Sequence, residues 1–241
     1  GRHDLRLAGL NQHIGSLFMG GDEYIEAARF LLSFAEDFPE IEFLDFGGGF
    51  GIPYHKENGE KRLDLSLVGT RLQRVVEEWV KKTGRRITIK IEPGRYTVAE
   101  CGALLGTVHA LKVNGGRTYA GTDIGLNVLI RRAMYDAHHD IEVYSDTPRE
   151  RAPLAPVTVV GNICETGDIL AKDRLLPPLR EGDILGVLDA GAYGMVMASN
   201  YNCRLRPAEV LITADGDDVL IRSRDILEDL ARHFPDMTGN R

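Results

Sequence analysis

The 241-residue sequence is poor in cysteine, has a single tryptophan and contains no long apolar run. Its three cysteines, Cys101, Cys164 and Cys203, lie far apart with no CxxC pair, which excludes a disulfide-stapled scaffold and a zinc motif built on paired cysteines. No apolar stretch approaches the ~20 residues of a membrane span, and the first residues lack the apolar segment of a signal peptide. We therefore expect a cytoplasmic protein with reduced thiols and no membrane partner.

Basic residues are outnumbered by acidic ones, since 29 Lys+Arg against 36 Asp+Glu give a net charge of −7. Nucleic acids and anionic membranes attract clustered Lys and Arg, so neither is expected as a partner of this acidic chain. Apolar residues make up 43% of the sequence and charged residues 27%, which is typical of a globular protein. The expected partner is a small molecule, and no metal site is predicted.

The first ninety or so residues alternate short apolar runs with longer amphipathic ones, which predicts β/α units around a parallel sheet. A closed (β/α)8 barrel needs eight strands and about 250 residues, whereas an open three-stranded sheet would leave its edges exposed. This part therefore reads as a portion of a larger barrel. Strands are expected at 5–10, 41–46 and 86–91, and helices at 22–35, with Asp22 as N-cap, and at 65–83, ended by Gly84.

Downstream, apolar segments of five to eight residues are separated by Gly, Asn, Asp and Pro, which favours a β-sandwich or barrel-like domain. The predicted fold class is thus α/β plus all-β. A partial (β/α)8 TIM-type barrel over residues 1–97 is followed by a C-terminal β domain over residues 98–241. Strands are expected at 102–112, 117–122, 141–144, 155–160, 183–188, 209–213 and 218–222, and a short helix at 225–234.

Each of the three predicted parallel strands ends in a polar or glycine-rich cluster, where parallel α/β proteins build ligand sites. Gly47, Gly48 and Gly49 let the backbone approach an anion closely, although a flexible turn is an equal alternative. Glu92 ends the third strand, and a salt bridge to Arg95 or to a helix is its ordinary explanation. His13, after the first strand, is more often a structural residue than a catalyst when taken alone.

Six motifs occur in order along the chain: HIGS at 13–16, DFGGGF at 45–50, EPGR at 92–95, CETGD at 164–168, DAGAYG at 189–194 and SNYN at 199–202. Taken together, they resemble the fold-type III decarboxylases that use pyridoxal phosphate (PLP). The resemblance covers nearly the whole chain. It implies decarboxylation of meso-2,6-diaminopimelate to L-lysine by a homodimer with active sites at the subunit interface. The alternatives are a related decarboxylase for ornithine, lysine, arginine or carboxynorspermidine, or a non-catalytic truncated remnant.

The resemblance also implies how PLP is bound. His13 stacks on the pyridine ring, and Glu92 pairs with the ring nitrogen so that the ring accepts the electrons left by departing carbon dioxide. With Cys164, these two are the implied catalytic residues. The implied contacts to the cofactor's phosphate and its surroundings come from Ser16, Gly47, Gly48, Gly49, Gly94, Arg95 and Tyr193.

For the substrate, the resemblance implies that Arg95 and Arg131 bind carboxylates and that Glu165 takes the distal ammonium group. Tyr135 and Tyr193 lie nearby, and Cys164 protonates the carbanion after decarboxylation. Without the resemblance, the favoured interpretation is that Cys164 is a small buried apolar residue and Arg131 a surface charge.

The lysine that holds PLP as a Schiff base lies in the family in a segment like Tyr-Ala-x-Lys-Ala-Asn, which this sequence does not contain. Strand alternation places Lys90 on the same face as Glu92, but a solvated or salt-bridged strand-end lysine is the favoured explanation. We therefore expect the 241 residues alone to be inactive.

Overall fold

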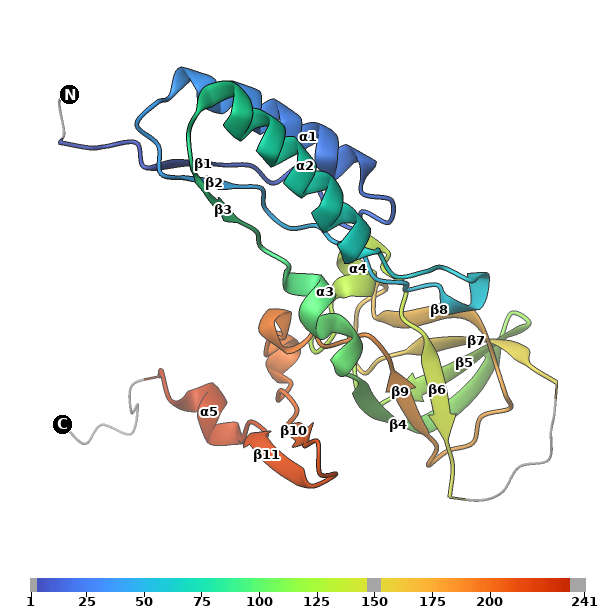
Figure 1. The fold of residues 1–241 in the computed structure, drawn as a ribbon. Helices are drawn as coiled ribbons and strands as arrows, with labels where there is room; N and C mark the ends of the chain where they lie inside the picture. The colour runs from blue at the N-terminus through green and yellow to red at the C-terminus, as the bar shows by residue number, and fades with distance from the viewer. Residues whose placement is uncertain (1–3, 147–152, 235–241) are drawn as a thin grey trace, which may run out of the picture. The chain divides into compact units, whose positions relative to one another are not determined.

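The computed structural model describes residues 4–146 and 153–234 (Figure 1). The chain divides into two compact units, Gly1–Cys101 and Gly102–Arg241. This division lies a few residues after the boundary predicted at residue 97. In the described part of the chain, no helix combines the length and the apolar character needed to cross a membrane.

The first unit contains a three-stranded parallel sheet in the order β1-β2-β3. Figure 1 shows two long helices side by side along these strands. The prediction of parallel β/α units is confirmed, although each strand is only three residues long and thus shorter than expected. The elements are β1 (Gly9–Asn11), α1 (Asp22–Phe34), β2 (Phe43–Asp45), α2 (Leu65–Thr83), β3 (Thr88–Lys90) and a short α3 (Gly94–Val98).

Local signals explain where the helices begin and end. The Asp64 carboxylate accepts a hydrogen bond from Leu67 N at 2.9 Å, and left-handed Gly84 ends α2, as predicted. The prediction that Asp22 caps α1 was wrong, because Gly21, at φ 82°, is the N-cap and Asp22 is the first helical residue. Instead, Asp22 forms an ion pair with Arg71 at 2.6 Å, which links α1 to α2.

The core of the first unit lies between the sheet and its helices. Leu44 and Phe46 on β2 and just after it are almost fully buried, as are Tyr24 and Leu32 on α1. The Tyr24 and Phe50 rings lie 4.9 Å apart between centroids, so the loop after β2 is packed against α1. This packing holds the loop after β2 in place at the end of the sheet.

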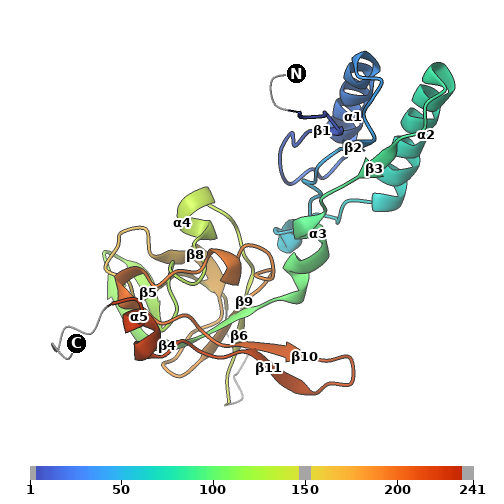
Figure 2. The ribbon, with the colours of Figure 1, turned by 90° about the vertical axis from the view of Figure 1, so that its left-hand side faces the viewer.

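The second unit is built on a six-stranded sheet in the order β6-β9-β4-β5-β7-β8, in which only β5 and β7 pair in parallel. A separate two-stranded hairpin, β10–β11, lies outside it (Figure 2). The predicted change from α/β to β structure is confirmed. The elements are β4 (Leu104–Asn114), β5 (Arg117–Thr122), α4 (Arg131–Tyr135), β6 (Ile141–Tyr144), β7 (Ala155–Val160), β8 (Ile169–Leu176), β9 (Ile184–Val187), β10 (Glu209–Ile212), β11 (Asp218–Arg222) and α5 (Leu227–Ala231).

Strand β8 was not predicted from the sequence. Its centre, Lys172-Asp173-Arg174, breaks the apolar alternation, and Asp173 has a left-handed φ of 47° beside a register shift in the pairing with β7. Its apolar residues nevertheless complete the core of the unit. Residues with no exposed surface in this core are Val108, Ala120, Val159, Ala171, Leu185 and Val187.

Candidate functional site

Three loops meet at the carboxyl edge of the parallel sheet in the first unit. The loop after β1 joins the one after β2 through Gln12 N, which donates to Asp45 O at 3.0 Å. The loop after β3 joins it through Glu92 N, which donates to Gly47 O at 2.9 Å. The motifs that contain His13, the triglycine and Glu92 are thus neighbours in space as well as in order.

Glycine is required in the triglycine because the backbones of neighbouring loops lie too close to leave room for a side chain. A Cβ on Gly48 would lie 2.0 Å from Glu92 O, and one on Gly47 would lie 2.3 Å from Gln12 O. Gly47 and Gly49 have left-handed φ values of 69° and 97°. The equal alternative, a merely flexible turn, does not describe these glycines, because neighbouring loops pack against them.

The amides of this loop are not all directed outward. Gly47 N donates to Asp45 Oδ1 at 3.0 Å, and Gly48 N lies 3.4 Å from His13 Nδ1. Gly94 N donates to Glu92 O at 2.9 Å. Within residues 4–146 and 153–234, the Gly49 N–H has no acceptor, so it is the triglycine amide open to a bound anion.

Ser16 and Arg95 lie together beside this loop. Arg95 Nη2 donates to Ser16 Oγ at 3.1 Å, and Arg95 Nη1 donates to Tyr54 Oη at 2.8 Å. The guanidinium carbon is 5.5 Å from the centroid of the Tyr54 ring. The Arg95 guanidinium and the Ser16 hydroxyl therefore lie next to each other in the site. Tyr54 was not predicted, because nothing in the local sequence marks it as a partner of Arg95.

His13 and Glu92 are both exposed at the same sheet edge. Among the described residues, the Glu92 carboxylate forms no ion pair or hydrogen bond, so the predicted alternative of a salt bridge to Arg95 was wrong. Lys90 is exposed, and its Nζ lies 3.5 Å from the centroid of the Phe43 ring. This cation–π contact gives Lys90 an ordinary structural explanation.

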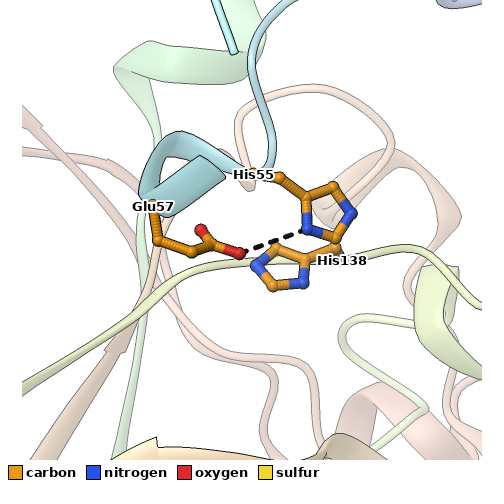
Figure 3. A group of neighbouring side chains, drawn as sticks. All are labelled: His55, Glu57 and His138. Atoms are coloured by element: carbon orange, nitrogen blue, oxygen red, sulfur yellow. Dashed lines mark hydrogen bonds and ion pairs between the residues drawn. The ribbon is translucent and has the colours of Figure 1, made fainter. Parts of the chain in front are cut away.

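A further pair of polar side chains lies on the turn that precedes α2. His55 Nδ1 is 3.3 Å from Glu57 Oε1 (Figure 3). Both side chains are about half exposed, at 42% and 52%. Because exposed ion pairs are screened by water, this one contributes little to stability.

In the second unit, Cys164 and Glu165 are exposed on the turn between β7 and β8. Cys164 was considered as a buried small hydrophobe, and that alternative was wrong. The buried Asp168 carboxylate organises this turn by accepting hydrogen bonds from Ile163 N at 2.7 Å and Leu126 N at 2.6 Å. Two side chains of the SNYN motif, for which no role was predicted, contact the turn: Tyr201 Oη donates to Glu165 Oε1, and Asn202 Nδ2 lies 3.4 Å from Cys164 Sγ.

Tyr193 and Tyr135 are exposed in the second unit. Tyr193 has a left-handed φ of 60° and precedes Gly194, where a Cβ would lie 2.3 Å from Ala190 O. Tyr135 is the last residue of α4, and 62% of its surface is exposed. The exposed Tyr193 therefore lies on a tightly packed turn of the backbone, whereas the exposed Tyr135 lies at the end of a helix.

Arg131, at the start of α4, is buried with 3% of its surface exposed, so the alternative of a surface charge was wrong. Its Nη1 lies 2.9 Å from His139 Nε2. His139 Nδ1 lies 2.7 Å from Leu188 O and must donate to that carbonyl, which leaves Nε2 as the acceptor for Arg131. A neutral His139 is therefore required by both contacts.

Acidification is expected to destabilise the second unit through His139. Burial, together with the charge of Arg131, lowers the pKa of His139 to about 4 from an ordinary 6.5. Below pH 6.5 His139 is protonated in the unfolded chain but stays neutral in the folded chain. The free energy of unfolding therefore falls as the pH falls, until the pH reaches the pKa of His139 in the folded chain. When the pH is lowered from about 7 to about 5, we expect His139 to reduce the free energy of unfolding by ~2 kcal/mol.

Urea unfolding at both pH values tests this expectation, with His139→Gln as the comparison. Glutamine does not titrate, and its amide offers one donor and one acceptor. The variant should therefore lose ~2 kcal/mol less than the wild type on acidification. Equal losses of unfolding free energy in both proteins would show that protonation of His139 does not contribute to the acid destabilisation.

Comparison with known proteins places the chain in a family. A family model described as pyridoxal-dependent decarboxylase, C-terminal sheet domain, matches residues 30–191. The chain belongs to the pyridoxal-dependent decarboxylase family. The match includes the triglycine, the Glu92 loop and the turn with Cys164, whereas His13, Ser16 and Tyr193 lie outside it.

Several relatives within the pyridoxal-dependent decarboxylases are named diaminopimelate decarboxylase. The diaminopimelate decarboxylase of Methanothermobacter thermautotrophicus is 39% identical over 93% of this chain and 52% of the relative. A crystal structure of diaminopimelate decarboxylase aligns with a TM-score of 0.88 and 33% identity, over 96% of this chain and 56% of the other. The Helicobacter pylori enzyme complexed with L-lysine aligns with a TM-score of 0.81 and 32% identity, over 93% and 54%. The chain thus spans about half the length of the curated relatives that it matches.

Proposed function

We propose that this chain is part of a PLP-dependent carboxy-lyase that converts meso-2,6-diaminopimelate to L-lysine. The observation that carries the proposal is the convergence of His13, the triglycine and Glu92 at one edge of a parallel sheet. Support comes from relatives named diaminopimelate decarboxylase and from the L-lysine complex of the Helicobacter pylori enzyme. A lysine/ornithine decarboxylase aligns at 23% identity, which supports the shared fold and not its substrate.

The residues at the sheet edge fit PLP. Because Gly48 has no Cβ, the loops after β2 and β3 pack closely together, and Gly49 N–H, Ser16 Oγ and the Arg95 guanidinium can donate to a phosphate. An imidazole face at His13 suits an aromatic ring. When bound, PLP supplies an electron sink for the decarboxylation. The Glu92 carboxylate would hold a proton on the pyridine nitrogen, while Gly47 and Gly94 would shape the backbone and Tyr193 would add a phosphate donor.

The substrate set lies mainly in the second unit. Glu165 would bind the distal ammonium group, and Arg95, Arg131, Tyr135 and Tyr193 would bind or line the carboxylates. Cys164 Sγ would carry the proton that replaces the lost carboxyl group. The contact of Arg131 Nη1 with His139 Nε2 would hold its guanidinium in one orientation.

For architecture and assembly, we propose that the first unit is a portion of a (β/α)8 barrel. Among the described strands, β1 and β3 each pair only with β2, which leaves an edge open on either side for further parallel strands. The proposed division remains residues 1–97 for the barrel portion and 98–241 for the β domain. The homodimer with active sites at its interface and the cytoplasmic location are parts of the same proposal.

Carbon dioxide release tests the proposed activity. The complete polypeptide that contains this chain, supplied with PLP, should release carbon dioxide from meso-diaminopimelate at least about tenfold faster than from ornithine, lysine or arginine, because only the first carries a second carboxylate for an arginine fork. A preference for ornithine, lysine or arginine would overturn the substrate. Absence of release from all four amino acids would overturn the carboxy-lyase.

A further inference from the structure

The loop 199–203, between the turn after β9 and the start of the C-terminal hairpin, is held at both ends. Ser199 N donates to Asn127 O at 2.8 Å. Asn200 Nδ2 donates to Arg204 O at 2.8 Å and to Asp225 Oδ2 at 3.0 Å. These contacts connect the loop to the segment between β5 and α4 on one side and to the segment after β11 on the other.

Asp225 makes the second anchor strong. Its buried carboxylate also accepts hydrogen bonds from Arg206 Nε at 2.8 Å and Arg222 Nη2 at 2.8 Å. Hydrogen bonds from the Arg206 and Asn200 side chains hold the pKa of Asp225 well below its usual range. The aspartate therefore stays ionised and keeps Asn200 in place at any pH near neutrality.

Between these anchors, the loop turns two side chains toward the turn with Cys164 and Glu165. Asn202 and Cys203 have left-handed φ values of 54° and 55°, a conformation that asparagine tolerates better than most residues. Tyr201 Oη donates to Glu165 Oε1, and Asn202 Nδ2 lies 3.4 Å from Cys164 Sγ. Adjacent residues of one loop thus contact adjacent residues of another.

We propose that Tyr201 and Asn202 are positioning residues, which act through Glu165 and Cys164 respectively. The inference rests on the proposed function for its substrate. Tyr201 occupies one oxygen of the Glu165 carboxylate and directs the other toward a cationic group. Asn202 directs an N–H at the Cys164 sulfur. One loop thereby orients both the specificity residue and the proton donor.

Each contact has a chemical consequence. The hydrogen bond to Glu165 raises the pKa of Tyr201, so the tyrosine remains a donor in neutral solution. When Cys164 gives its proton to the reacting carbon, the S–H bond breaks, a C–H bond forms and the electron pair stays on sulfur, which water later reprotonates. The Asn202 N–H stabilises the negative sulfur that results.

Alkylation of Cys164 by iodoacetamide tests Asn202 without any turnover. The complete protein is treated under pseudo-first-order conditions, and the peptides containing Cys164 and Cys101 are quantified by mass spectrometry. Both Asn202→Asp and Asn202→Gly tolerate a left-handed φ and remove the N–H donor. We expect alkylation of Cys164 to slow about fivefold in both variants, with Cys101 unchanged as the internal control. Wild-type rates in both variants would overturn the role of Asn202.

Steady-state kinetics test Tyr201. In Tyr201→Phe, KM for meso-diaminopimelate should rise about five- to tenfold while kcat changes less than about twofold, because binding of the distal ammonium is weakened and the proton donor is untouched. Tyr144→Phe is the matched control, since Tyr144 donates to Glu142 in the same way on β6, and it should leave both constants unchanged. A fall in kcat with unchanged KM, or no effect on either constant, would overturn the role of Tyr201.

The two proposals fail in different ways. If the wild-type protein releases no carbon dioxide from any amino acid, the proposed function fails, whereas the alkylation rates still decide whether Asn202 controls the Cys164 sulfur. If the wild type is active but both sets of variants match it, only the positioning proposal fails.

Discussion

Replacing Gly48 by alanine is expected to lower the free energy of unfolding of the first unit by about 3 kcal/mol and to abolish PLP binding. The new Cβ would lie 2.0 Å from Glu92 O, and a backbone carbonyl cannot rotate away as a side chain can. The loops after β2 and β3 must therefore separate, which moves Glu92 and Gly94 relative to the triglycine. Urea unfolding followed by the fluorescence of Trp79, on α2 of the same unit, measures the loss.

Gly69→Ala is the matched control for Gly48→Ala. Gly69 lies within α2, and a Cβ there would meet nothing within 4 Å. Because alanine is the better helix former, this variant should gain up to about 1 kcal/mol and bind PLP normally. If Gly48→Ala unfolded at the wild-type urea concentration and bound PLP as the wild type does, the close packing of Gly48 against Glu92 would have no role.

Glu92→Gln is expected to reduce kcat for decarboxylation about ten- to a hundredfold with little change in KM. Glutamine keeps the size of the side chain but cannot supply the negative charge that holds a proton on a ring nitrogen. A charge-assisted hydrogen bond contributes about 1.5–3 kcal/mol, which corresponds to this range of rates. Carbon dioxide release by the complete, PLP-loaded enzyme measures the effect.

Glu42→Gln serves as the control for this substitution. Glu42 is 60% exposed and pairs with Arg6, which is itself 64% exposed, so its loss should leave kcat within about twofold of the wild type. A Glu92→Gln enzyme that retained wild-type kcat would contradict the assignment of Glu92 to the ring nitrogen.

The sequence predicted those elements whose patterns are local and complete. Helix α2 was predicted with both of its ends, because Val68, Val75 and Trp79 define one apolar face and a glycine ends the helix. Strands β5, β6, β7 and β11 were predicted at their observed bounds. By contrast, β8 was missed because charged residues interrupt it, and the N-cap of α1 was assigned one residue late because glycine, not aspartate, caps it.

Within the candidate site, the sequence indicated the strand-end motifs but not their partners. Tyr54 contacts Arg95 over 41 residues of sequence, and Tyr201 contacts Glu165 over 36. Such pairs are created by the packing of distant loops, which local periodicity does not encode. The burial of Arg131 against His139 was unpredictable for another reason, since a buried arginine requires partners that only the folded chain supplies.

A crystal structure of the complete polypeptide with PLP would show directly whether the edge of the parallel sheet is the cofactor site. We expect the phosphate to lie against Gly49, Ser16 and Arg95 and the ring nitrogen to lie within hydrogen-bond distance of the Glu92 carboxylate. PLP bound with its phosphate away from the triglycine, or with Glu92 facing solvent, would show that these residues do not form the site.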